Sequence, residues 1–147
     1  MIGPSALLIG LVCVVGAADK EKRATDKRYG IQADLKAYPQ ATPKEALASV
    51  LKAIDAKRID YLLAQLADPD WVDKRVKGNG GSFTEVVEET TAQLIGDPGP
   101  AKLLRRFLKD GTWNVGDTRA SVRLKDVEER VYLHKVDGRW FLENRKK

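Results

Sequence analysis

Cysteine and histidine are the residue types that this sequence has least of. The chain of 147 residues contains a single cysteine, Cys13, and a single histidine, His134. Cys13 lies in an apolar run at the N-terminus, so a chain cleaved after that run would have no thiol at all. Disulfide bonds, thiolate catalysis and cysteine-based metal sites are therefore excluded from such a mature protein.

Charged side chains are absent from residues 1–18. Residues 6–15 are an apolar run, and small residues ending in Ala17 and Ala18 follow it before dense charge begins at Asp19. This arrangement predicts a secretory signal peptide, residues 1–18, cleaved near Ala17 or Ala18. The alternative is an uncleaved membrane anchor, for which this stretch is near the lower length limit. We therefore expect an exported protein, periplasmic or extracellular, with membrane contact only if the segment is retained.

Positive charge exceeds negative charge by a modest amount. The chain has 26 Lys and Arg against 21 Asp and Glu, a formal net charge of +5. Short basic clusters occur at residues 105–106 and 145–147, but most other basic residues alternate with acidic ones, as at residues 125–126. This pattern is typical of a solvated surface and not of a track for phosphates. Nucleic acid is therefore a disfavoured partner.

Composition and periodicity divide the rest of the chain into two parts. Residues 19–41 predict a charged tether followed by an extended arm, in which apolar residues alternate from Ile31 to Ala37 until Pro39 ends the pattern. Residues 42–147 predict a single domain. Their mixture of apolar and charged residues is that of a globular protein that can bury a core without disulfides or a metal.

Helices are predicted for the first half of this domain. Residues 42–45 and 82–85 are capping boxes, each followed by apolar residues at helical spacing. Asp60 is expected to cap a short second helix, and Pro69 to begin a third. The last helix should end at Gly111 in a left-handed conformation.

The C-terminal end, from residue 111 to residue 147, predicts a four-stranded antiparallel meander. Gly116-Asp117 suits a type II′ turn and Asp137-Gly138 a type I′ turn. As two-residue loops, the first turn would place Val115 opposite Thr118. The fold class predicted is α+β, with N-terminal helices packed on a curved C-terminal sheet.

The second turn places Lys135 opposite Trp140, and the alternation of strands then assigns residues to faces. One face is strongly apolar and should form the core. Its members are Trp113, Val115, Ala120, Val122, Leu124, Val131, Leu133, Trp140 and Leu142.

The opposite face mixes apolar and polar residues. Around the last hairpin it carries Tyr132, His134, Val136 and Phe141. An exposed apolar area of this kind usually has something on it. The arm before the domain is one candidate cover, and a second copy of the chain, giving a homodimer through this sheet face, is the slightly favoured one.

Two stretches carry a resemblance to a known superfamily. Residues 41–69, ATPKEALASVLKAIDAKRIDYLLAQLADP, and residues 136–144, VDGRWFLEN, resemble the opening helical pair and the terminal strands of the nuclear transport factor two-like (SnoaL-like) superfamily. The resemblance implies a cone-shaped fold with a pocket at its wide end. Because the superfamily contains isomerases, dehydratases, hydrolases and non-catalytic binding domains, the fold does not choose an activity.

Few residues are candidates for a functional site. Catalytic members of this superfamily place paired titratable groups inside the cone, whereas His134 points away from the core face, so we predict no catalytic residue. Asp68, Asp70 and Asp73 lack the ligand spacing of a calcium loop, and we predict no metal or cofactor site. The pocket or interface candidates are Tyr61, Trp71, Tyr132, His134 and Phe141.

The sequence therefore leads to two hypotheses of different classes. The first is an exported, non-catalytic domain that binds an unknown small ligand or protein partner. The second is a small enzyme of the isomerase or dehydratase type, with a pocket at the wide end of the cone. A pair of titratable groups facing each other in the interior would favour the enzyme.

Overall fold

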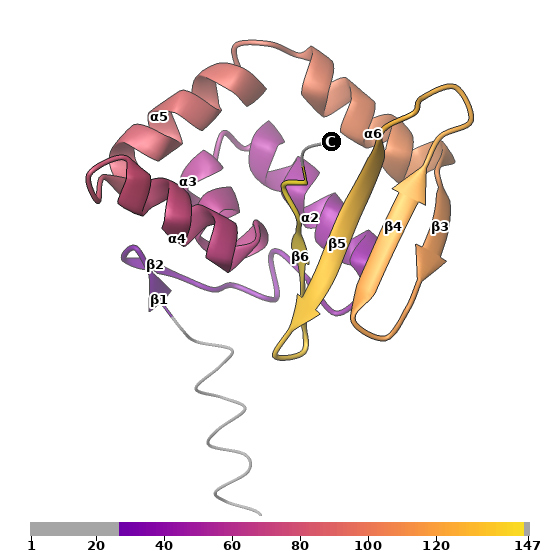
Figure 1. Cartoon of the computed structure of the whole chain (residues 1–147), viewed down its shortest axis with the longest axis horizontal. Coiled ribbons are helices and arrows are strands. Elements are labelled where there is room, and N and C mark those ends of the chain that lie inside the picture. The colour runs from indigo at the N-terminus through magenta and orange to yellow at the C-terminus, as the bar shows by residue number, and fades with distance from the viewer. Residues whose placement is uncertain (1–26, 146–147) are drawn as a thin grey trace, which may run out of the picture.

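The computed structural model describes residues 27–145, so the predicted signal peptide and most of the tether lie outside the described residues. The helices are α2 (Pro43–Asp55), α3 (Ile59–Tyr61), the π-helix η2 (Leu62–Leu66), α4 (Pro69–Gly78), α5 (Phe83–Leu94) and α6 (Gly99–Asp110). The strands are β1 (Lys27–Arg28), β2 (Ile31–Gln32), β3 (Thr112–Val115), β4 (Arg119–Arg123), β5 (Arg130–Val136) and β6 (Arg139–Leu142). Helices precede an antiparallel sheet, which confirms the α+β class. Figure 1 shows β3–β6 at one end of the molecule, α4 and α5 at the other, and α2 between them.

The N-cap bond of each predicted capping box is formed, and the carboxylate of Glu45 accepts from the amide of Ala41 instead of that of Thr42. The hydroxyl of Thr42 accepts from the amide of Glu45 at 3.1 Å, and the hydroxyl of Ser82 accepts from the amide of Glu85 at 3.2 Å. Each bond satisfies an N–H group that would otherwise lack a partner at the helix start. The starts of α2 and α5 are therefore encoded locally.

Two other helix ends differ from the prediction. Asp60 does not cap the second helix but lies within α3, where its carboxylate pairs with Arg58 at 2.9 Å. Gly111 has extended backbone, with φ of −72°, and not the expected left-handed one. A Cβ at this glycine would collide with the carbonyl oxygen of Phe107 and with a methyl of Val122. Glycine is needed here because α6 ends directly against the sheet.

The four strands pair in the order β3-β4-β5-β6, all antiparallel. The predicted register of the second hairpin is confirmed, with Lys135 opposite Trp140. Asp137 and Gly138 have φ values of 50° and 81°, the positive values that a type I′ turn requires at both central residues.

The predicted register of the first hairpin is wrong. Val115 lies opposite Ala120 and not opposite Thr118. The turn lies one residue later in the chain than predicted. In this position the carbonyl oxygen of Thr118 accepts from the amide of Lys135 on β5 at 2.8 Å, so the later turn extends the pairing with the neighbouring strand. Because the partner moves by two residues, every side chain keeps its predicted face.

The core face of the sheet packs against α2 and α6. Two clusters of buried residues fill this interface, one made of Ala46, Ala120, Leu133 and Trp140 and the other of Leu47, Phe107, Val122 and Leu124. Val115 was predicted in the core but is 55% exposed, because it lies at the end of the edge strand β3. The remaining members of the predicted core face are buried or half-buried.

The arm before α2 packs on the helices and along β6. The amide of Trp140 donates to the carbonyl oxygen of Gln40 at 3.0 Å, and the side-chain amide of Gln40 donates back to Trp140 at 2.7 Å. Tyr38 stacks on Tyr61 with ring centroids 4.3 Å apart, and Ile31 joins the same helical core cluster. These apolar side chains of the arm therefore pack against the helical part of the domain.

Arg139 joins three separate segments of the chain. Its guanidinium donates to the side-chain oxygen of Gln40 at 2.7 Å and to the side-chain oxygen of Gln65 at 3.0 Å. It also donates to the backbone oxygen of Gln65, at 3.1 Å. Gln40 and Gln65 are 2% and 0% exposed, so these oxygens have little water to bind instead. Arg139 thus links the arm, η2 and β6.

The beginning of the arm is held by the carboxylate of Asp73 on α4. The guanidinium of Arg28 and the hydroxyl of Tyr29 each donate to it at 2.6 Å, and Tyr29 stacks on Phe83 with centroids 4.2 Å apart. Burial alone would raise the pKa of Asp73, but the hydrogen bonds from Arg28 and Tyr29 outweigh burial and lower it. Burial and the bond to Asp73 raise the pKa of Tyr29 to about 12.

We expect this end of the arm to loosen in acid. A carboxyl whose pKa is lower in the folded state stabilises the fold above the unfolded pKa, about 3.9 for Asp. That contribution is lost as pH falls through the lower folded value of Asp73. Hydrogen exchange of the amides of residues 28–32, measured against residues of β5, should show the loosening. Asp73→Asn should remove most of the pH dependence, and an unchanged profile in that variant would contradict the assignment to Asp73.

Candidate functional site

Two predicted site residues are part of the helical core. Tyr61 is 2% exposed, and its hydroxyl accepts from the amide of Asp34 at 2.8 Å and donates to the Asp34 carbonyl at 3.3 Å. Burial raises the pKa of Tyr61. Trp71 is half-buried on α4 against the same cluster. Both side chains hold elements together, and the structure does not bring them to the residues on β5 and β6.

Phe141 was predicted in an exposed apolar area and is instead 5% exposed. The guanidinium carbon of Arg139 lies over its ring, 5.0 Å from the centroid, and the ring of His134 is 6.5 Å away. Val136 is exposed at 39%, beside the hairpin turn. The apolar area expected on this face is therefore smaller than the sequence suggested.

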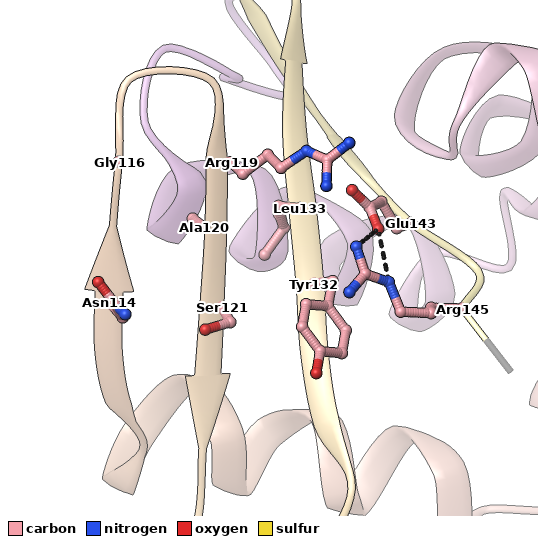
Figure 2. Close-up of a pocket in the computed structure, with 9 residues that line it drawn as sticks. All are labelled: Asn114, Gly116, Arg119, Ala120, Ser121, Tyr132, Leu133, Glu143 and Arg145. Carbon is pink, nitrogen blue, oxygen red and sulfur yellow. Dashed lines mark hydrogen bonds and ion pairs between the residues drawn. The ribbon is translucent and has the colours of Figure 1, made fainter. Parts of the chain in front are cut away.

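The sheet face turned away from α2 and α6, here called the outer face, carries a pocket of about 270 Å³. Alternation along the strands places Asn114, Ser121 and Tyr132 side by side on β3, β4 and β5. Figure 2 shows these residues together with two arginines and a glutamate. The outer-face pocket is lined by Asn114, Gly116, Arg119, Ala120, Ser121, Tyr132, Leu133, Glu143 and Arg145.

Charged side chains line one side of the outer-face pocket. Arg145 places its guanidinium carbon 3.9 Å from the ring centroid of Tyr132 and pairs with the carboxylate of Glu143 at 2.9 Å. Figure 2 shows Arg119 reaching across β5 toward Glu143. Within residues 27–145, no hydrogen bond or ion pair is formed by the side chain of Arg119. The pocket therefore combines a cation without a fixed partner and a cation held by one carboxylate.

His134 lies next to this pocket, between two carboxylates. Its Nδ1 is 3.3 Å from Glu143 and its Nε2 is 3.5 Å from Asp68, which precedes α4. A second cavity of about 420 Å³, which His134 and Asp68 line, shares Arg119, Glu143 and Arg145 with the outer-face pocket. In the part of the chain that the structure describes, no group of three or more His, Cys, Asp or Glu residues is placed to hold a metal ion.

Sequence reasoning found Tyr132 and His134 but missed most of the pocket. Strand alternation could have added Arg119, which shares a face with Ser121. Arg145 follows the last strand, where no period applies, and its position over Tyr132 depends on how the chain turns after β6. The approach of Asp68 depends on a backbone bond from its amide to Leu142, which sequence distance does not reveal.

Comparisons with other proteins add no information about this site. No known protein family, curated protein or solved structure matches the chain. Between residues 27 and 145, no helix combines the length and apolar character needed to cross a membrane.

Proposed function

We propose that this chain is an exported, non-catalytic domain that binds a ligand or protein partner with the outer face of its sheet. The outer-face pocket carries the proposal, because donors and acceptors from β3, β4, β5 and the segment after β6 converge on it. A concave site with a few convergent polar groups is the usual form of a binding site. The single observation behind this choice is that convergence of donors and acceptors on one concave site.

The character of the interior favours binding over catalysis. An isomerase or dehydratase inside the cone needs titratable groups that face each other. Among residues 27–145, the buried polar side chains Gln40, Ser49 and Gln65 do not titrate. The buried tyrosines Tyr38 and Tyr61 stack on each other, and the Tyr61 hydroxyl is bonded to the backbone of Asp34. The enzyme alternative would therefore have to use His134 on the outer face, where Asp68 and Glu143 flank both ring nitrogens.

We also propose that the chain belongs to the nuclear transport factor two-like superfamily. The packing of a long capped helix, α2, against an antiparallel meander supports it. A homodimer through the outer face is also proposed, although the burial of Phe141 removes part of the apolar area that suggested it. Light scattering on the purified chain measures the dimer directly, and a monomer at all concentrations would contradict it.

Filling the outer-face pocket should abolish ligand or partner binding. Ser121 is half-buried in the centre of the pocket, and Ser121→Trp would occupy the space with an indole ring. Native mass spectrometry of the protein recovered from its own cells should show a mass above that of the chain, and the variant should lose it. Ala92→Trp, on an exposed position of α5, is the matched control. Bound mass retained by Ser121→Trp would contradict the proposed site.

A further inference from the structure

Positive charge gathers on the outer face around the proposed site. Arg119 and Arg123 project from β4, Arg130 projects from β5, and Arg145 follows β6; all four are exposed. Within the outer-face pocket, Glu143 is the carboxylate that faces Arg119 and Arg145, while Asp68 and Asp70 line the neighbouring cavity that shares these three residues. A concave surface with an excess of one charge concentrates small ions of the opposite charge.

The strand register adds to this imbalance. Arg123 and Arg130 are directly opposite each other on β4 and β5. Like charges in directly opposed positions destabilise a sheet. Because neither arginine lines the outer-face pocket, the pair adds to the positive charge of the face but not to the contacts of a bound ligand.

We propose that the outer-face pocket binds a small oxyanion, a carboxylate or a phosphate, between the guanidinium groups of Arg119 and Arg145. This inference rests on the proposed function and specifies its ligand class. Guanidinium forks bind planar carboxylates and phosphates through paired N–H donors. The carboxylate of Glu143 pairs with Arg145, and Arg119 extends toward the same carboxylate. The position of this carboxylate is therefore the position in which we expect an external anion to bind.

Neutral donors complete the pocket beside the two arginines. The amide of Asn114, the hydroxyl of Ser121 and the phenol of Tyr132 line its other side. These groups suit the hydroxyl or carbonyl oxygens of a small polar molecule. Glu143 would act as an internal competitor, because an external anion must share or displace its contact with Arg145.

The test is a titration of the purified chain with citrate and, separately, with inorganic phosphate, at about 0.15 M salt to screen distant charges. Arg119→Gln should weaken binding at least about tenfold, which corresponds to the loss of a charge-assisted contact. Arg119→Lys, which keeps the charge without the fork, should fall between this variant and the original chain. Glu143→Gln should strengthen binding several-fold by releasing Arg145.

Arg123→Gln is the matched control, since it removes the same charge from the same strand about 13 Å from Arg119. We expect it to change the affinity less than about twofold, because at this salt concentration the separation exceeds the screening length of about 8 Å. Equal losses in Arg119→Gln and Arg123→Gln would overturn the site in favour of diffuse attraction. Binding of citrate alone or of phosphate alone would identify which oxyanion the pocket takes.

The absence of binding to either anion would overturn the inference but not the proposed function. In that case Ser121→Trp would still remove the mass bound to the native protein, and the ligand would be neutral. Amide chemical shifts of Ser121 and Tyr132 give a second readout of the same titration. Shifts confined to residues outside the outer-face pocket would also overturn the inference.

Discussion

Trp140→Ala should lower the free energy of unfolding by about 3–5 kcal/mol, the range found for large-to-small changes of buried aromatic residues. Trp140 is 4% exposed and lies between α2 and the sheet, in contact with the cluster that contains Ala46 and Leu133. Truncation would leave a cavity at the junction of the helical and sheet parts. Neighbouring side chains could fill this cavity only in part, because α2 and the strands are fixed by their own hydrogen bonds.

The measurement is a denaturant titration followed by circular dichroism, with Val115→Ala as the control. Val115 lies on the same sheet face but is 55% exposed, so its truncation should change stability by less than about 0.5 kcal/mol. A Trp140→Ala midpoint equal to that of the original chain would show that the ring does not support the core.

Arg139→Met should lower the free energy of unfolding by about 2–4 kcal/mol, because it leaves buried acceptors without donors. Methionine keeps much of the length of the side chain, and packing against Phe141 is partly retained. The oxygens of Gln40 and Gln65, however, lose the guanidinium that now binds them at 2.7–3.1 Å. Replacing a buried cation is harmless only when its partners are replaced as well.

The control for this variant is Arg123→Met, an exposed arginine on the same sheet, which should be close to neutral. Hydrogen exchange should show where the loss acts. In Arg139→Met, protection should fall first in the arm around Gln40 and in η2, whereas β4 and β5 should keep theirs. Uniform loss across the sheet would contradict the role of Arg139 as the link among these three segments.

Local patterns predicted the parts of this fold that depend on neighbouring residues. The capping boxes at Thr42 and Ser82 and the type I′ turn at Asp137-Gly138 use contacts within a few positions of the chain, so their residue types were sufficient. The register predicted for the first hairpin was wrong because the turn lies one residue later, where Thr118 can pair with Lys135 on β5. The assignment of side chains to faces was still correct, because the register shifted by two residues.

The candidate site was harder to predict because it depends on contacts across long sequence distances. Tyr132 and His134 could be placed on the outer face by alternation alone. The positions of Arg145 over Tyr132 and of Asp68 beside His134 come from chain turns outside regular strands. Such contacts have no period in the sequence, so residue type and spacing carry little information about them.

The pairing of Gln40 with Trp140 has a consequence for how the chain reaches its final state. These residues are 100 positions apart, yet each donates a hydrogen bond to the other's backbone oxygen. Contacts of such high sequence separation form late, because a long loop must close before they contribute. During synthesis the arm leaves the ribosome first but cannot find its partner until the last hairpin has emerged. We therefore expect the described domain to close in a final step that joins its beginning to its end, and until then the part of β6 around Trp140 lacks this pairing.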